Sequence, residues 1–115
     1  MKLPLEGCLL RIFIGESSKC DGRSLYEWIV VKAREQGLAG ATVFRGMMGF
    51  GATNSRVIHT FKVIRLSEDM PVIIEIVDTR ERLEGFLELI EDKIDAGLVT
   101  LEKAEVRFYR SKKSV

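Results

Sequence analysis

Short apolar runs recur along this chain, separated by stretches in which apolar and charged residues follow helical spacing. Residues 8–14 (CLLRIFI) and 72–77 (VIIEIV) are continuous runs rich in β-branched residues, and their length favours strands. The patterns of residues 41–45, 57–66 and 98–109 predict further strands, the second of them as a strand or a hairpin arm.

Two amphipathic stretches predict helices. The first begins at a capping box of Ser24 and Glu27, whose side chains would each satisfy an unpaired backbone N–H group, and it ends at Gly37. The second begins at Asp78 and ends at Gly97. Its apolar positions recur every third or fourth residue and form one stripe: Leu83, Phe86, Leu87, Ile90 and Ile94.

The order of these elements predicts the fold class. Strand, helix, strand, an elaborated middle, strand, helix, strand is the βαββαβ order of a ferredoxin-like α+β sandwich, with an elaborated loop or extra strand between the second and third strands. A chain of 115 residues has room for one such domain. We expect that domain to span residues 1–110, followed by a disordered tail at residues 111–115.

One face of the predicted sheet lacks a cover. Right-handed crossovers place both helices on the same face, so the other face should meet water and be polar. However, Leu9, Phe13, Ile73 and Val77 alternate with the core positions and belong to that open face. An apolar open face calls for a partner, and the simplest partner is another copy of the chain.

Composition narrows the function classes. The chain carries 18 basic and 17 acidic residues, a balance that predicts neither a nucleic-acid-binding protein nor a polybasic membrane anchor. Cys8 and Cys20 form neither a disulfide framework nor a metal-ligand pattern, and the sequence shows no leader or membrane span. We therefore expect a cytoplasmic protein with reduced thiols. Asn54 and Gln36 are the only side-chain amides, a bias expected of a heat-adapted protein.

Charge is distributed unevenly along the chain, and the acid-free part holds the candidate binding site. Residues 36–67 contain four basic residues and no acid, whereas the acids of residues 68–95 form the solvated outer face of the second helix. Residues 45–51 read RGMMGFG, in which glycines would let backbone N–H groups approach a phosphate. The alternative is a loop whose glycines only relieve backbone strain.

The side chains of this stretch suit an anionic ligand that carries a base. Arg45, Arg56 and His59 would neutralise the anion, and Phe50 or a methionine would cover the base. The candidate binding residues are Arg45, Gly46, Met47, Met48, Gly49, Phe50, Gly51, Arg56 and His59.

Lys103, Arg107 and Arg110 form a second basic cluster near the end of the chain. If the last strand lies close to residues 46–51, in the same subunit or the next, both sets would converge on one polyanion. The alternative is ordinary decoration of a strand surface.

No catalytic or metal centre is predicted. The sequence has neither an HExxH nor a GxSxG motif, and its single histidine lacks a Ser or Cys partner in a motif. Glu75 stands alone in an apolar strand, and we interpret it as the partner of a basic side chain across an interface. A small-molecule enzyme that uses Glu75 or His59 is the alternative.

Three blocks of the sequence resemble one family: GATVFRGMMGFG at residues 40–51, LSEDMPVIIEIVDT at residues 66–79 and GLVTLEKAEV at residues 97–106. They are similar to a bacterial and archaeal family of small proteins grouped with the PII-like signalling proteins. The resemblance extends over residues 5–110.

The resemblance implies a homotrimer of ferredoxin-like subunits with the open sheet faces turned inward. It also implies an adenine nucleotide (AMP, ADP or ATP) bound between subunits. By position, residues 48–70 correspond to the long PII loop that engages a target, and residues 97–100 with Lys103, Arg107 and Arg110 correspond to the phosphate-binding walls. Family members are often encoded near a small membrane ion exporter of the fluoride-channel type, which implies a membrane-protein target.

The chain also departs from true PII proteins. It lacks their TGxxGDGK phosphate loop and the loop tyrosine that carries uridylylation, so classical nitrogen regulation is not expected. We expect instead a sensor that reports ligand binding through the order of residues 48–70. The alternative from another class is a structural or metal-tolerance trimer, similar to the CutA-type proteins that share this fold.

Overall fold

The computed structural model describes residues 6–51, 59–60 and 69–112. Several expectations therefore lie outside the described residues: the place of Arg56, most of the strand at residues 57–66, and the last residues of the predicted tail.

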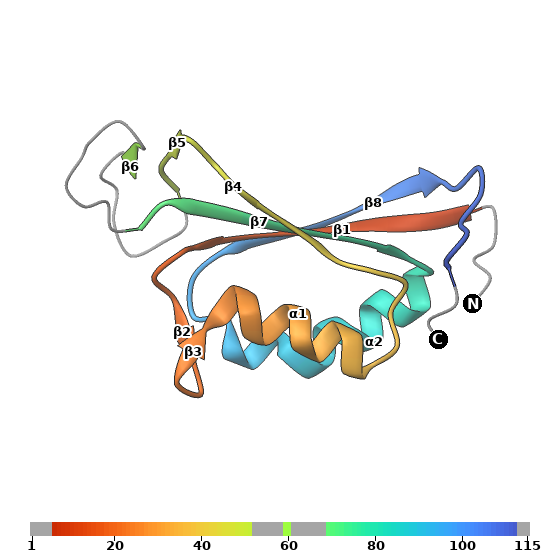
Figure 1. Cartoon of the computed structure of the whole chain (residues 1–115), viewed down its shortest axis with the longest axis horizontal. Coiled ribbons are helices and arrows are strands. Elements are labelled where there is room, and N and C mark those ends of the chain that lie inside the picture. Colours follow the sequence, from red (N-terminus) through yellow and green to blue (C-terminus); the bar gives the residue numbers. More distant parts are fainter. Residues whose placement is uncertain (1–5, 52–58, 61–68, 113–115) are drawn as a thin grey trace.

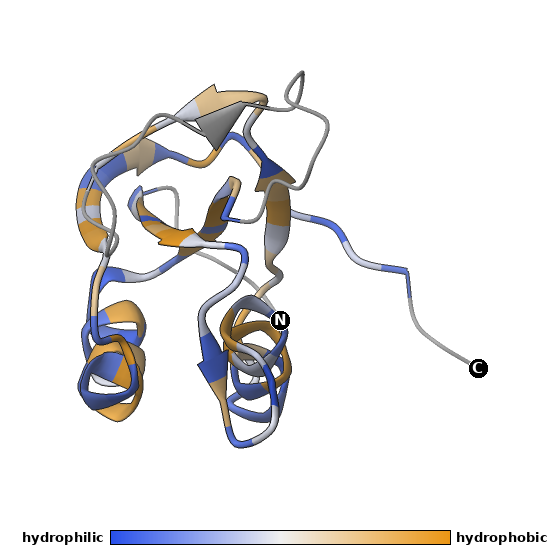
Figure 2. Cartoon of the chain, turned by 90° about the vertical axis from the view of Figure 1, so that its left-hand side faces the viewer, coloured by the Kyte–Doolittle hydropathy of each residue, from blue (hydrophilic) through white to orange (hydrophobic). Residues whose placement is uncertain are grey.

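The chain folds as one four-stranded sheet with two helices on the same face (Figures 1 and 2). The strand order is β4-β7-β1-β8, and every neighbouring pair is antiparallel. This is the predicted ferredoxin-like arrangement. The elements that build it are β1 (Glu6–Gly15), α1 (Leu25–Glu35), β4 (Thr42–Arg45), β7 (Pro71–Asp78), α2 (Arg80–Ile90) and β8 (Leu98–Glu105).

Short elements elaborate this frame. A hairpin of β2 (Lys19–Cys20) and β3 (Arg23–Ser24) precedes α1. A second small ladder pairs β5 (Met48–Gly49) with β6 (His59–Thr60), and Figure 1 shows it at the end of the sheet away from the C-terminal end of β8. The predicted elaboration between the second and third strands of the ferredoxin-like order therefore includes an extra ladder.

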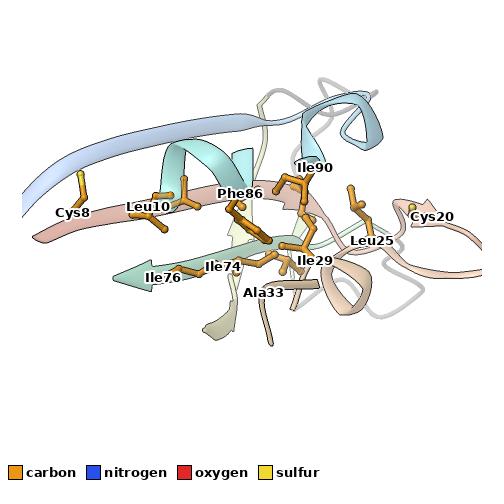
Figure 3. Close-up of a cluster of buried hydrophobic side chains, with 14 residues drawn as sticks. Cys8, Leu10, Cys20, Leu25, Ile29, Ala33, Ile74, Ile76, Phe86 and Ile90 are labelled. Carbon is orange, nitrogen blue, oxygen red and sulfur yellow. The ribbon is translucent and has the colours of Figure 1, made fainter. Parts of the chain in front are cut away.

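The core lies between the sheet and the two helices (Figure 3). Alternate residues of β1 and β7 are buried, as the period of two requires, and they meet one stripe of each helix. Among the buried side chains are Leu10, Ile12, Leu25, Ile29, Ile74, Ile76, Leu83, Phe86 and Ile90.

The start of α1 differs from the prediction. Ser24 is the N-cap residue, but its side chain makes no capping hydrogen bond, so the expected capping box is wrong. The backbone N–H of Leu25 instead donates to the carbonyl of Ser18 at 2.8 Å. The β2–β3 hairpin brings that carbonyl to the helix start, where it satisfies the N–H of the first helical residue.

The start of α2 is shifted by one residue. Thr79 caps this helix, and its hydroxyl accepts the N–H of Arg82 at 3.2 Å. Asp78 is the last residue of β7 and is fully buried, where its carboxylate accepts the N–H groups of Ala39 and Thr79 at 2.9 and 2.7 Å. Asp78 therefore fixes the loop before β4 and does not cap the helix.

The end of α2 also differs from the prediction. The helix ends at Ile90 and passes into the 3-10 turn η1 (Glu91–Lys93), so Gly97 does not end it. Gly97 lies just before β8, where a Cβ atom would stand 2.7 Å from the carbonyl oxygen of Phe13. A close approach to the backbone of β1 therefore explains this glycine.

The last strand is shorter than predicted, because β8 ends at Glu105 and not at Tyr109. The segment beyond it leaves the sheet edge, and the Tyr109 hydroxyl donates to the carbonyl of Ala39 at 2.7 Å. Since Ala39 precedes β4, the C-terminal segment reaches the strand on the opposite edge of the sheet.

The open face carries the predicted apolar residues. Register places Phe44, Ile73, Phe13 and Leu98 side by side on the four neighbouring strands, so one apolar row crosses the whole sheet. Phe44 and Leu98, at its two ends, are exposed. An exposed apolar row of this length is typical of a surface that another protein covers.

A polar row lies beside the apolar one. Arg11 donates from Nε to Glu75 Oε2 at 2.9 Å and from Nη1 to Glu102 Oε1 at 2.6 Å. The hydrogen bond to Glu75 raises the pKa of Arg11 above its ordinary value; burial opposes this rise, and the charge of Glu102 adds to it. Glu75 thus pairs within its own chain, which corrects the expectation of a partner across an interface.

Two leucines of α2 provide a matched test of the core. We expect Leu83→Ala to lower the free energy of unfolding by about 2–5 kcal/mol, because Leu83 is fully buried. Leu89→Ala, on the same helix but 44% exposed, should change it by less than about 1 kcal/mol. Urea denaturation monitored by circular dichroism measures the free energy of unfolding of both variants. A similar decrease in the two variants would contradict the assigned core.

Candidate functional site

The glycine-rich segment at residues 45–51 begins at the end of edge strand β4 and lies against the start of β7. The N–H of Gly46 donates to the carbonyl of Pro71 at 2.7 Å. A Cβ atom on Gly46 would lie 2.8 Å from Pro71 Cγ, and one on Gly49 would lie 3.2 Å from the same atom. Close contact with the proline ring therefore accounts for these two glycines without a ligand.

Arg45 is the charged residue of this segment, and Glu16 holds it. Arg45 Nη2 lies 2.8 and 2.6 Å from the two carboxylate oxygens of Glu16, and Nε lies 3.3 Å from Oε1. The hydrogen bond to Glu16, followed by the charge of that carboxylate, raises the pKa of Arg45 above its ordinary value. The guanidinium is therefore charged, and a carboxylate already occupies its binding edge.

The turn after β1 also holds the chain just before β7. The N–H of Glu16 donates to the carbonyl of Met70 at 2.8 Å. The N–H and hydroxyl of Ser17 donate to Asp69 Oδ1 at 3.0 and 2.7 Å. Gly15 has no room for a Cβ atom, because the Asp69 carboxylate occupies that space. The turn at residues 15–18 therefore contacts both ends of the predicted 48–70 loop region, at Arg45 and at Asp69.

The apolar side chains of the segment face solvent. Met47 is 70% exposed, Met48 62% and Phe50 68%. An aromatic ring and two thioethers in one exposed stretch suit contact with a flat apolar group. They follow Arg45 closely in the sequence, and the division between a base-covering and an anion-binding part stays a prediction.

The remaining residues predicted in this stretch are placed only in part. His59 pairs through its backbone with Gly49 in the β5–β6 ladder, which brings position 59 to the glycine-rich segment. The His59 side chain and the whole of Arg56 lie outside the description.

The second basic cluster lies far from Arg45 within one chain. Lys103 on edge strand β8 pairs with Cys8, whereas Arg45 on the other edge strand is level with Val72, the partner of Ile14. Because Cys8 and Ile14 lie at opposite ends of β1, Lys103 and Arg45 are about 20 Å apart along the strands. They are also about 14 Å apart across the sheet, since they lie on its two edge strands. Tyr109 holds the following segment, with Arg107 and Arg110, near the start of β4 and not near its end. Arg45 therefore does not meet the second basic cluster within one subunit.

A polar hollow of about 260 Å³ lies beside the turn at residues 15–18. Two acids and two lysines are among its lining residues, so its formal charge is balanced. It lies between the end of the 48–70 region and the turn before Gly97, and none of the residues that the family resemblance assigns to the phosphate-binding walls lines it. The lining residues are Ser17, Ser18, Lys19, Leu25, Asp69, Lys93, Asp95 and Ala96.

Two further properties bear on function. The described residues contain no group of three or more His, Cys, Asp or Glu side chains placed to hold a metal ion. Within the same part of the chain, neither helix is long and apolar enough to cross a membrane.

Sequence reasoning missed Glu16 and Asp69. Both are acids that lie outside the acid-free stretch, although Glu16 reaches that stretch from the turn after β1. The predicted ferredoxin-like order could have revealed them. In that order the two central strands are antiparallel, so the residues just after β1 lie beside those just before β7.

Solved structures with the same arrangement define the class of fold. CPII, a nitrogen regulatory PII-like protein from Thiomonas intermedia K12 bound to ADP, AMP and bicarbonate, matches with a TM-score of 0.65 at 17% identity, over 88% of each chain. A PII-like signalling protein from Thermus thermophilus also matches with a TM-score of 0.65, at 15% identity, over 89% of this chain and 90% of that one. The fold is that of the PII-like proteins.

The chain belongs to the DUF190 family (Uncharacterized ACR), whose model matches residues 7–106. A UPF0166 protein of Aquifex aeolicus is 43% identical over 98 residues, which are 85% of this chain and 90% of the relative. A UPF0166 protein of Methanocaldococcus jannaschii is 33% identical over 103 residues, 89% of this chain and 93% of the relative. The family resemblance inferred from the sequence blocks is confirmed.

The packing of Gly46 can be tested directly. We expect Gly46→Ala to lower the free energy of unfolding by about 1–3 kcal/mol, because the added methyl group would meet a proline ring atom that cannot swing away. Gly40→Ala is the matched control, since a Cβ atom there meets nothing within 4 Å. Urea denaturation measures both changes, and a Gly46→Ala variant as stable as Gly40→Ala would contradict the contact with Pro71.

Proposed function

We propose that this protein is a non-enzymatic PII-like regulator that binds an adenine nucleotide between subunits of a homotrimer. The observation that carries the proposal is the PII-like fold together with CPII, a protein of the same fold solved with ADP and AMP. The resemblance of the sequence blocks to the PII-like group implies the same class of ligand.

The nucleotide is proposed to bind at residues 45–51. Arg45 would take a phosphate group, and the exposed Phe50, Met47 and Met48 would cover the adenine. Arg56 and His59 follow in the same acid-free stretch and would add to the anion site.

A trimer would complete this site. Arg45 and Lys103 lie on opposite edges and at opposite ends of the sheet in one chain, so a shared polyanion would need Lys103, Arg107 and Arg110 from a neighbouring subunit. The exposed apolar row of the open face supports an assembly in which these faces turn inward.

Ligand binding is proposed to be reported through residues 48–70. Both flanks of this region contact the same turn, through Glu16 on one side and Ser17 on the other. A ligand that contacts residues 45–51 in only one conformation of the region would favour that conformation. The target would be a partner protein, for which the resemblance suggests a small membrane ion exporter.

Calorimetry tests the nucleotide proposal. We expect AMP, ADP or ATP to release heat on titration into the protein, and Arg45→Ala to weaken that binding at least about tenfold, because a charge-assisted hydrogen bond to phosphate is lost. Arg80→Ala is the matched control, since Arg80 is an exposed arginine paired with Glu84 on α2. Absence of heat with all three nucleotides and with cyclic nucleotides would refute the proposal.

Light scattering coupled to size exclusion tests the trimer. We expect a mass of three times the 13.0 kDa of one chain. Phe13→Arg should reduce it to that of a single chain, because it places a charge in the apolar row of the open face. Leu89→Arg, at an exposed position on the helix side, should leave the trimer intact. A wild-type mass of one chain would contradict the assembly.

A further inference from the structure

Arg45, the cation at the start of the proposed nucleotide site, is already paired. Glu16 meets it with both carboxylate oxygens, at 2.6 and 2.8 Å from Nη2. This is the two-oxygen contact that a phosphate group would make with the same guanidinium edge. A ligand phosphate and the Glu16 carboxylate therefore cannot both hold Arg45 in this way.

We propose that Glu16 is an intramolecular competitor for the phosphate of the ligand, and that it sets the affinity and the anion selectivity of the site. The inference rests on the proposed function, because it assigns a role within the same nucleotide site. Glu16 comes from the turn after β1, outside the acid-free stretch that supplies the other candidate residues.

The surroundings of Glu16 allow its side chain to leave. Its backbone is fixed by the N–H bond to the Met70 carbonyl at 2.8 Å, but its side chain is 28% exposed and that of Arg45 is 54% exposed. Exposed ion pairs are weak, because water and dissolved salt screen the attraction between the two charges. The carboxylate is thus able to turn into solvent while the turn at residues 15–18 stays in place.

Competition of this kind favours phosphates over weaker anions. A terminal phosphate carries more negative charge and one more acceptor oxygen than a carboxylate. Its interaction with the Arg45 guanidinium is therefore stronger than the Glu16–Arg45 interaction that it replaces. A carboxylate ligand or chloride offers no such excess and leaves the Glu16–Arg45 pair intact. Glu16 therefore makes Arg45 selective for phosphates over weaker anions, and it lowers the affinity of the site for the phosphate ligand.

Glu16→Gln tests the inference, because it keeps the shape of the side chain and removes its charge. We expect Glu16→Gln to bind ADP about five- to tenfold more tightly than the wild type in calorimetry, and to gain measurable competition by acetate. Glu84→Gln is the matched control, since it makes the same change in the surface pair with Arg80 and should leave ADP binding unchanged. Glu16→Asp keeps the charge but shortens the reach, and an intermediate affinity is expected.

A second measurement reports the ion pair without any nucleotide. Phenylglyoxal modifies free guanidinium groups, and mass spectrometry of the digested protein gives the rate at Arg45. We expect this rate to rise at least about threefold in Glu16→Gln and to stay unchanged in Glu84→Gln, because only the first variant weakens the charge-assisted contact to Arg45. Thermal unfolding of each variant verifies that it is folded.

The outcomes separate the two proposals. Equal or weaker ADP binding by Glu16→Gln, with wild-type binding intact, overturns the competitor role and leaves the proposed function standing. Failure of every folded variant to bind an adenine nucleotide overturns the proposed function and this inference together. An unchanged rate of Arg45 modification in Glu16→Gln overturns the inference whatever the calorimetry shows.

Discussion

The antiparallel pairing of β1 with β7 is the contact on which the rest of the structure depends. Eight successive residue pairs join these central strands, from Cys8 with Asp78 to Gly15 with Pro71. Their shared alternation sends one set of side chains to the helices and the other set to the open face. A slip by one residue would exchange the two sets and lose the core, so the burial of alternate residues fixes the register.

The same register assembles the candidate site from three separate segments. Because Gly15 meets Pro71, the turn that follows β1 lies beside Asp69 and Met70. Because Arg45 pairs with Val72 on the other side of β7, the guanidinium comes within reach of Glu16 across one strand. The two central strands thus carry the charge arrangement of the site as well as the stability of the fold.

Sequence patterns predicted the features that repeat and missed those that depend on one contact. The alternation in residues 72–77 and the helical spacing around Leu83 correctly gave the strand, the helix and the apolar open face. The cap of α1, the role of Gly97 and the partner of Arg45 were not predictable in this way. Each depends on a backbone or side-chain group from a distant segment, which spacing along the chain does not encode.

The hydrogen bond from Tyr109 to Ala39 and the ion pair of Arg45 hold the two ends of β4 by contacts of different chemical kinds. The hydrogen bond links the segment after β8 to the loop before β4, so the two edge strands are tied together at that end. Arg45 lies at the other end of β4, where an exposed ion pair provides the side-chain hold. Backbone pairing with β7 holds β4 along its whole length. The side-chain contact at its start is a hydrogen bond between uncharged groups, whereas the contact at Arg45 is an ion pair, so only the Arg45 end loosens as the salt concentration rises.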